Sequence, residues 1–152
     1  MMEEKKRYSS REMRRFSYLV GETEALYHAL ARRLGLSDSA MSLLFVLCDE
    51  GGACPLQLAL RHSGLSKQTA NSALRRLEAE GVVYLEPLGA RGKRVCLTEA
   101  GRALAEATVA RVMAAENAVL AAWSAEDVDA YLRLTERYLV DLREKTKDLH
   151  RE

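Results

Sequence analysis

The stretch LSKQTANSALRRLEAEG, residues 65–81, decides the fold. Ser66 suits an N-cap, because its hydroxyl can accept hydrogen bonds from the free amides of a first helical turn. Gly81 suits the end of the same helix, since glycine adopts the left-handed conformation past a last turn without a steric cost. Between these two residues, apolar side chains recur at helical spacing and predict one buried face. They are Ala70, Ala73, Leu74 and Leu77.

The opposite face of this predicted helix carries cations, amides and hydroxyls, and its first acid is Glu78. Its residues are Lys67, Gln68, Asn71, Ser72, Arg75 and Arg76. An ordinary surface helix alternates acids with bases. In a major groove, which is wide enough to admit a helix, amide side chains pair with adenine and arginine pairs with guanine. We therefore interpret this face as DNA-reading; a short basic surface helix is the alternative.

Charge is unevenly distributed along the 152 residues, although the formal net charge is only +1. Residues 54–98 hold seven cations and three anions, whereas residues 99–152 hold eight cations and eleven anions. A basic middle segment points to one anionic partner that docks there. No apolar run reaches the length of a membrane span, and the beginning of the chain lacks the apolar core of a signal peptide. We expect a cytoplasmic protein with no membrane partner.

The segment that precedes residues 65–81 predicts a core helix and then a helix-turn-helix. Residues 40–49, capped by Ser37 or Ser39, are apolar nearly all round, as in a helix buried on every side. Pro55 then opens a short helix that ends near His62. A glycine-containing turn joins this short helix to the reading helix, which is the helix-turn-helix pattern.

After Gly81 the hydrophobic pattern becomes that of strands, at residues 82–86 and 94–97. The loop between them has a hairpin composition and carries Arg91 and Lys93. A β-ribbon beside a reading helix is a wing. Its cationic tip can follow the phosphates or enter a minor groove, whose negative potential attracts arginine.

Long helices are predicted on both sides of this module. Ser9 begins a capping box for a helix that runs to about Arg33, and the apolar stripe of that helix is longer than a small domain can cover. Thr98 caps a helix to about Trp123, and Ser124 caps the last helix. We expect part of these stripes to face another subunit.

The order of these segments resembles the MarR family of winged-helix transcriptional regulators over nearly the whole chain. Three segments carry the match, at residues 65–69 (LSKQT), 77–81 (LEAEG) and 97–101 (LTEAG). The resemblance implies a homodimer whose first and last helices interlace, with each reading helix in a major groove and each wing near a minor groove. The wing departs from the family pattern: the family commonly has an acid two residues before the wing arginine, and Gly89 stands there before Arg91.

The predicted fold class is mainly α with a small β-hairpin wing. It comprises an N-terminal dimerisation helix (1–35), a winged helix-turn-helix domain (36–98) and C-terminal dimerisation helices (99–152). The predicted function is that of a repressor that binds a pseudo-palindromic, double-stranded operator as a homodimer. The resemblance also suggests a small aromatic or apolar effector, in a cleft between the dimer helices and the winged domain. No cofactor is expected.

The predicted DNA contacts fall into three groups. The base-reading residues are Gln68, Asn71, Ser72 and Arg75. The phosphate-positioning residues are Ser66, Thr69 and Arg76. The remaining cations near the duplex are Lys67, Arg91, Lys93 and Arg94.

Three other kinds of protein were considered. No phosphate loop, nucleophile elbow or zinc-protease motif indicates an enzyme. A metal-responsive regulator would need ligands that converge in space, because the histidines are scattered at positions 28, 62 and 150. A redox-responsive regulator would use Cys48, Cys54 or Cys96, of which Cys54 is expected to be the most exposed. A helical protein-interaction module that does not bind DNA is the contrasting class.

Overall fold

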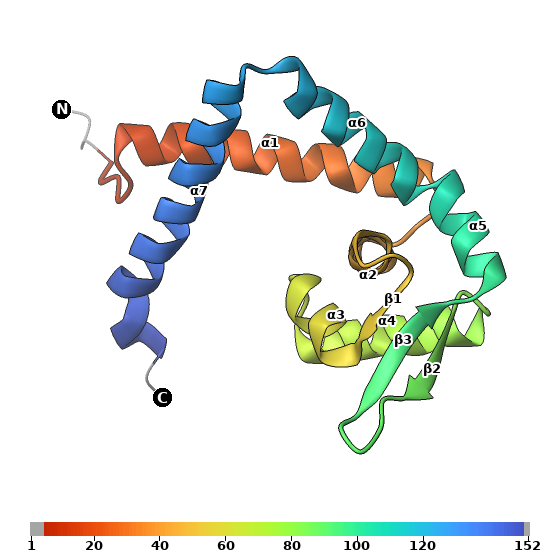
Figure 1. Cartoon of the computed structure of the whole chain (residues 1–152). Coiled ribbons are helices and arrows are strands. Elements are labelled where there is room, and N and C mark those ends of the chain that lie inside the picture. Colours follow the sequence, from red (N-terminus) through yellow and green to blue (C-terminus); the bar gives the residue numbers. More distant parts are fainter. Residues whose placement is uncertain (1–4, 151–152) are drawn as a thin grey trace. The chain divides into compact units, whose positions relative to one another are not determined.

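The computed structural model describes residues 5–150 and is mainly helical, with one small sheet (Figure 1). The elements are α1 (Arg11–Arg33), α2 (Asp38–Asp49), β1 (Ala53–Pro55), α3 (Leu56–His62), α4 (Lys67–Ala79), β2 (Val83–Pro87), β3 (Lys93–Leu97), α5 (Glu99–Ala107), α6 (Val109–Ala122), α7 (Ala125–Thr146) and the 3-10 turn η1 (Lys147–His150). The chain forms two compact units, one up to Ala110 and one from Arg111. Each unit is described by itself.

The hydroxyl side chains predicted to cap helices do so at four of the five predicted starts. Ser66, Thr98 and Ser124 each accept a hydrogen bond from the backbone amide three residues later. At the second helix, where two serines were open, Ser37 is the cap. The prediction for the first helix was wrong by one residue, because Ser10 rather than Ser9 accepts from the Met13 amide at 3.0 Å.

Helix α2 forms the centre of the first unit. Leu43, Leu44 and Leu47 are fully buried, and α2 packs against α1, α3, α4 and the sheet. This confirms that the apolar segment at 40–49 is a core helix. Helix α4 packs its Leu74 and Leu77 against this core, which fixes the face that α4 leaves outside.

The sheet has three antiparallel strands in the order β1-β3-β2. The hairpin β2–β3 was predicted, and its register pairs Val83 with Leu97 and Glu86 with Arg94. Strand β1 was not predicted: Ala53, Cys54 and Pro55 pair with the other side of β3. A third strand therefore ties the beginning of the helix-turn-helix to the root of the wing.

The long helix predicted from Thr98 to Trp123 is divided in two. Thr108 leaves the helical conformation (φ −125°, ψ −91°) between α5 and α6. Its side chain is buried, and its hydroxyl donates to the Leu104 carbonyl at 2.7 Å. The prediction of one helix was wrong, because residues 102–123 contain no glycine or proline to mark the break.

The wing root is joined to α5 at a close contact. The Thr98 hydroxyl donates to the Gly81 carbonyl at 2.5 Å, and the Thr98 amide donates to the Val82 carbonyl at 3.0 Å. A Cβ atom on Gly101 would lie 1.9 Å from that Val82 oxygen. Only glycine fits at this position, so the strand that begins the wing lies directly against α5.

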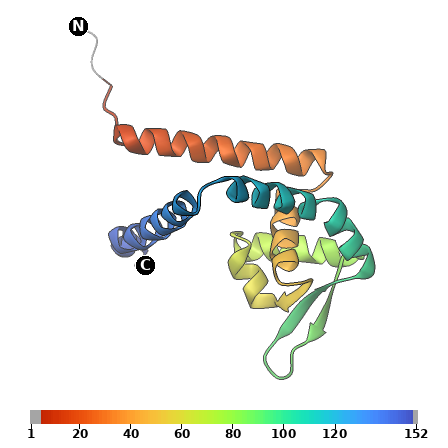
Figure 2. The same cartoon turned by 45° about the horizontal axis from the view of Figure 1, so that its top comes forward.

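Two long helices leave large apolar side chains exposed. On α1, which is one continuous helix (Figure 2), these side chains are Met13, Phe16, Tyr18, Leu19, Val20 and Leu26. On α7 they are Tyr131, Leu132, Leu134, Tyr138, Leu139, Val140 and Leu142. Within the second unit, Trp123 packs edge-on against Tyr131, with ring centroids 5.5 Å apart. Over residues 5–150, no helix combines the length and apolar character needed to cross a membrane.

Candidate nucleic-acid interface

The turn between α3 and α4 is held by short-range hydrogen bonds. The Ser63 hydroxyl donates to the Leu60 carbonyl at 3.0 Å and accepts from the Leu65 amide at 3.3 Å. The Ser66 hydroxyl then accepts from the Thr69 amide at 3.2 Å and donates to the Thr69 hydroxyl oxygen at 2.8 Å. Hydrogen bonds within this segment therefore hold the first turn of α4 in place. Two predicted phosphate-positioning residues, Ser66 and Thr69, lie in this turn.

The face of α4 opposite the core is exposed as predicted. Ala70, Leu74 and Leu77 are buried. The exposed residues are Lys67, Gln68, Thr69, Ser72, Arg75 and Arg76, and Asn71 is half-buried. Within residues 5–150, the only ion pair that α4 makes is a weak one, between Arg76 and Glu80 at 3.8 Å. A row of basic and amide groups therefore faces solvent.

The candidate residues of α4 divide between two flanks of the helix. On the wing side, Asn71 and Arg75 line a hollow of about 180 Å³ together with Lys93 of β3. Two residues remote in sequence from the α4 candidates, Leu56 and Leu85, complete its apolar wall. The structure therefore brings two base-reading candidates together with a wing cation.

On the other flank, α4 borders a groove of about 730 Å³. Gln68, Thr69, Ser72 and Arg76 form one wall. The opposite wall comes from the turn between α1 and α2 and the first residues of α2, and Leu104 of α5 closes one side. The α1–α2 residues were not predicted to approach α4, because no local pattern relates residues 35–40 to residues 68–80. All residues that line this groove belong to the first unit.

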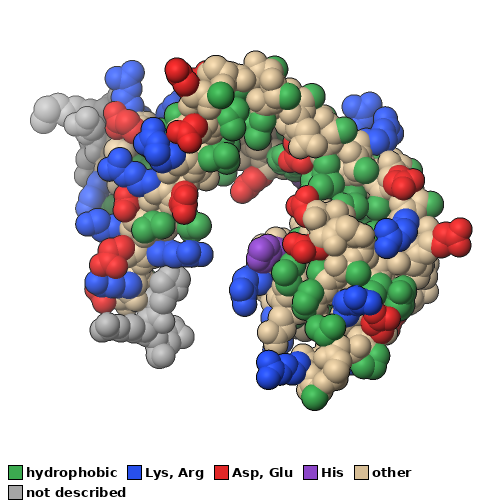
Figure 3. All heavy atoms as spheres, viewed as in Figure 1, with side chains coloured by type: hydrophobic (Ala, Val, Ile, Leu, Met, Phe, Trp, Pro, Cys, Tyr) green, Lys and Arg blue, Asp and Glu red, His purple; other side chains and the backbone are tan. Residues whose placement is uncertain are grey.

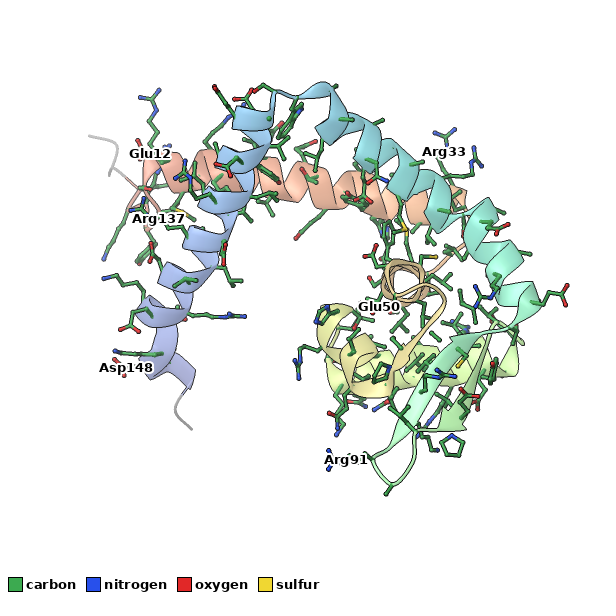
Figure 4. The ribbon with its side chains drawn as sticks, in the orientation of Figure 1. Glu12, Arg33, Glu50, Arg91, Arg137 and Asp148 are labelled. Atoms are coloured by element: carbon green, nitrogen blue, oxygen red, sulfur yellow. The ribbon has the colours of Figure 1, made fainter. Side chains whose placement is uncertain are left out.

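The wing ends in a tight loop that presents Arg91. The Leu88 amide donates to the Gly92 carbonyl at 2.9 Å, and the Arg91 amide donates to the Leu88 carbonyl at 3.2 Å. These bonds close the turn and leave the Arg91 side chain exposed at the tip, pointing away from the unit (Figure 4). Figure 3 shows Lys and Arg side chains at this end of the unit. Lys93, at the beginning of β3, is also exposed.

Arg94 differs from the other wing cations, because Glu86 on the neighbouring strand holds it. The Arg94 Nε donates to a Glu86 carboxylate oxygen at 2.7 Å, and a second guanidinium nitrogen contacts the same oxygen. This hydrogen bond raises the pKa of Arg94 above its usual value. Glu86 was not among the predicted site residues. The hairpin register, which places it opposite Arg94, is the signal that could have identified it.

Of the three cysteines, Cys54 is less accessible than predicted. Cys54, expected to be the most exposed, is 2% exposed, because it lies in β1 rather than in a loop; Cys96 is also buried. Burial raises the pKa of the Cys54 thiol, and Glu50 adds to the effect. Burial likewise raises the pKa of Cys48, followed by the charge of Asp49. The prediction that Cys54 is exposed was wrong.

The histidines lie on different elements. The His28 Nδ1 atom lies 2.7 Å from an Asp38 carboxylate oxygen, an exposed contact between α1 and α2 that sequence spacing did not reveal. His62 is exposed at the end of α3, and the side chain of His150 lies outside the described residues. In the described part of the chain, no group of three or more His, Cys, Asp or Glu side chains could hold a metal ion.

Comparisons with known proteins agree with this architecture. The MarR family model matches residues 34–94, which cover α2 to the beginning of β3. The HTH-type transcriptional repressor Rv2887 of Mycobacterium tuberculosis is 34% identical over 106 residues, which are 68% of this chain and 76% of that protein.

Two solved structures show the same fold. The MarR family transcriptional regulator SPO1453 from Silicibacter pomeroyi is 28% identical, with a TM-score of 0.66 over 90% of this chain and 98% of that one. Bordetella bronchiseptica BpsR, whose DNA binding is regulated by 6-hydroxynicotinic acid, is 21% identical, with a TM-score of 0.60 over 82% and 98%. With the identity and coverage of the mycobacterial repressor, these findings show that the chain belongs to the MarR family of transcriptional regulators.

Proposed function

We propose that this regulator binds a pseudo-palindromic operator as a homodimer and places α4 of each subunit in a major groove. One observation carries the proposal. The exposed face of α4 has cations and amides and no acid before Glu78, while its other face is anchored in the core. An element held so firmly can offer its side chains to base edges in fixed positions, which base recognition requires.

Within this proposal, the three groups of candidates keep distinct roles. Gln68, Asn71, Ser72 and Arg75 read bases. Ser66, Thr69 and Arg76 position the helix on phosphates, with Lys67 beside them. Arg91 enters or follows a minor groove, while Lys93 and Arg94 support it on the backbone. The hydrogen bonds of Arg94 to Glu86 favour a positioning role for this residue.

The dimer is proposed because large apolar side chains on α1 and α7 are exposed to solvent in a single subunit. Such a large exposed apolar surface on a folded chain marks an interaction site. One winged helix-turn-helix domain buries only about 600–1,000 Å² of its surface against DNA, so two such domains joined in a dimer gain affinity and specificity together. We assign dimerisation to residues 1–35 and 99–152, and DNA binding to residues 36–98.

The regulator is proposed to repress and to be released by a small molecule. The mycobacterial relative is a transcriptional repressor by name, which supports repression. The groove beside α4 is large enough for a small ligand, and Arg76 with its neighbouring hydroxyls suits an aromatic carboxylate. A ligand there would compete for residues that the proposal assigns to DNA.

The groove is tested with Leu104→Trp, which puts a larger side chain into it from α5 and leaves the sequence of α4 unchanged. A panel of aromatic carboxylic acids, beginning with 6-hydroxynicotinic acid, is titrated into the protein–operator complex. We expect an active acid to raise the dissociation constant of the operator for the wild type and to have at least tenfold less effect on the variant. An equal response of both proteins would remove the groove from the mechanism.

The proposed function is tested by selecting bound duplexes from a random pool. We expect two inverted half-sites about one helical turn apart. With about eight phosphates neutralised per dimer, the logarithm of the affinity should fall with the logarithm of salt concentration at a slope near −7. Failure to enrich any sequence, with no salt dependence, would favour a protein-interaction module.

A further inference from the structure

We propose that Arg102 is a positioning residue for DNA binding: from α5 it holds the turn between α2 and β1, and through that turn it sets the orientation of the wing. The proposal rests on the function proposed above, because the orientation of the wing matters only if Arg91 contacts DNA. Arg102 was not among the predicted site residues. Its partner in the turn, Gly51, lies 51 residues earlier in the chain, so local spacing could not reveal the contact.

The Arg102 guanidinium lies against the two glycines that follow α2. A Cβ atom on Gly52 would lie 2.7 Å from each terminal nitrogen of Arg102 and 2.8 Å from its guanidinium carbon. The guanidinium thus occupies the space that a side chain at residue 52 would take. One of these nitrogens also donates a long hydrogen bond, at 3.5 Å, to the Gly51 carbonyl. Among residues 5–150, no carboxylate lies within 4.0 Å of Arg102, so no ion pair draws it away from the turn.

The C-terminal end of α2 favours a cation that α2 itself lacks. A helix C-terminus carries a partial negative charge, which a nearby basic side chain stabilises. Helix α2 has no basic residue in its last turn, and its final residue and its C-cap are both acids, Asp49 and Glu50. Arg102 brings a positive charge from α5 to the residue that follows this C-cap. The contact is therefore electrostatic as well as steric.

Gly52 connects α2 to the sheet. Its amide donates to the Leu47 carbonyl of α2 at 2.7 Å, and its carbonyl accepts from the Leu97 amide at the end of β3 at 2.8 Å. The pairing of β1 with β3 continues directly from there, with Ala53 opposite Cys96. A displacement of Gly52 would therefore disturb the end of α2 and the end of β3 together.

The first turn of α5 holds the sheet on both sides of β3. Helix α5 begins where β3 ends, at the end of the sheet away from the wing tip (Figure 1). Thr98 binds Gly81 and Val82 before β2, and Arg102 holds the turn before β1, on the other side of β3. Without Arg102, only the β2 side keeps its side-chain contact with α5. At about 3.3 Å per residue, a rotation of β3 by about 5° at its end moves its beginning by about 1 Å, and Arg91 beyond it by more.

The test is a double-mutant cycle on the selected operator. Arg102→Gln removes the charge and Arg102→Lys keeps it, and each is combined with Arg91→Ala on the wing or with Arg75→Ala on α4. Arg111→Gln, which alters an exposed arginine of α6, controls for the loss of one cation. Affinities are measured from about 50 to 200 mM salt. The temperature is one at which circular dichroism shows every variant to be folded.

We expect Arg102→Gln to raise the dissociation constant of the operator about fivefold in the wild-type background and less than about twofold in the Arg91→Ala background. The second effect is smaller because the wing contact that Arg102 positions is already lost. In the Arg75→Ala background the rise should again be about fivefold, because α4 is held independently of Arg102. Arg102→Lys should stay within about twofold of the wild type, since it keeps the charge at the end of α2.

Equal losses in all three backgrounds would overturn the proposal, because Arg102 would then act without the wing. Direct contact with DNA is another role for an exposed arginine. A salt slope that falls by about 1 per subunit when Arg102→Gln is added to Arg91→Ala would overturn the proposal in favour of such a phosphate contact. An Arg102→Lys variant as weak as Arg102→Gln would also overturn it, because the charge would then not hold the turn.

Failure of the proposed function would look different, because hydrogen exchange reports the contact in the protein without DNA. In Arg102→Gln, the amides of Gly52 and Leu97 should exchange at least about tenfold faster than in the wild type. The Ala70 amide of α4, bonded to the Ser66 carbonyl at 2.9 Å, should keep its wild-type rate. If no sequence is selected but the exchange differs in this way, Arg102 holds the turn although operator recognition has failed. Unchanged exchange at Gly52 and Leu97 would reject the proposal whatever sequence is selected.

Discussion

At the scale of single residues, two exposed arginines of the winged helix-turn-helix domain have different surroundings. Arg75 borders the hollow that Asn71 and Lys93 share, whereas Arg91 stands alone at the tip of the wing. We expect Arg75→Ala to cost about 1–3 kcal/mol on the selected operator and less on scrambled DNA, because a base contact is lost. Arg91→Ala should weaken both duplexes alike and reduce the salt slope by about 1 for each wing.

Dissociation constants on operator and scrambled duplexes, measured over a salt series, check both expectations. Lys145→Ala, on α7, controls for the loss of one cation. An equal loss on the two duplexes for Arg75→Ala would show that this arginine contacts the backbone and does not read a base.

The thiols give a second prediction at this scale. Ala53 pairs with Cys96, and Cys54 pairs with Val95, so Cys54 and Cys96 project from opposite faces of the sheet. They should form no disulfide with each other. Burial also raises the pKa of Cys54 above its ordinary value of 9.0, so the less reactive thiol form persists at neutral pH.

We therefore expect a thiol reagent at pH 7.5 to modify half-buried Cys48 first, and Cys54 and Cys96 only after urea unfolds the protein. Peroxide should leave operator affinity unchanged, with Cys48→Ala as the reference protein. Rapid labelling of Cys54 in the folded state, or loss of affinity after oxidation, would revive the redox-responsive regulator.

At the scale of elements, two glycines in helices make a matched pair. A Cβ on Gly101 would collide with the Val82 carbonyl oxygen, whereas no heavy atom within 4 Å would meet a Cβ on Gly21. Gly101→Ala should lower the free energy of unfolding by about 1–3 kcal/mol, because the wing root must move away from α5. Gly21→Ala should raise it by about 0.5–1 kcal/mol, because alanine favours the helix interior of α1.

Urea unfolding followed by circular dichroism measures both changes. The Gly101→Ala variant should also bind the operator more weakly, since the displaced strand leads into the wing. If both substitutions stabilise the protein, the close approach of α5 to Val82 does not hold in solution.

Elements with chemical boundary markers were predictable from the sequence. Ser66, Thr98 and Ser124 mark helix starts because a hydroxyl can satisfy free amides, and Gly81 marks an end because it adopts φ +75°. Strand β1 has no such marker. Three residues are too few to show alternation, and their pairing depends on β3, which lies about 40 residues later.

The candidate site was predictable only along one helix. The exposed face of α4 follows from the spacing of Ala70, Leu74 and Leu77. The contact of Arg75 with the wing hollow and the groove beside Arg76 arise from elements that packing brings together, so spacing within α4 could not reveal them. The burial of Cys54 was missed for the same reason, since it depends on an unpredicted strand.

At the scale of the whole molecule, the proposed dimer can be broken through α7. Leu132 and Leu139 are exposed, and their spacing of seven residues places them on one side of the helix. Leu132→Glu/Leu139→Glu should weaken dimerisation by about 3 kcal/mol or more, because two charges enter an apolar interface. Operator affinity should fall with it, as each head then binds alone.

Analytical ultracentrifugation and operator binding test this prediction. Leu134→Glu is the control, because Leu134 is equally exposed but two residues from Leu132, about 200° around the helix. A double variant that remains dimeric, or a wild type that is monomeric at micromolar concentration, would contradict the proposed assembly.

The absence of a side chain at Gly101 has a mechanical consequence. With α5 against the Val82 carbonyl and Thr98 bonded to both Gly81 and Val82, no slack separates the helix from the strand. We therefore expect a displacement of α5 to displace the beginning of β2 as well. A ligand that contacts Leu104 in the groove, one turn further along α5, is then expected to change the orientation of the hairpin that carries Arg91.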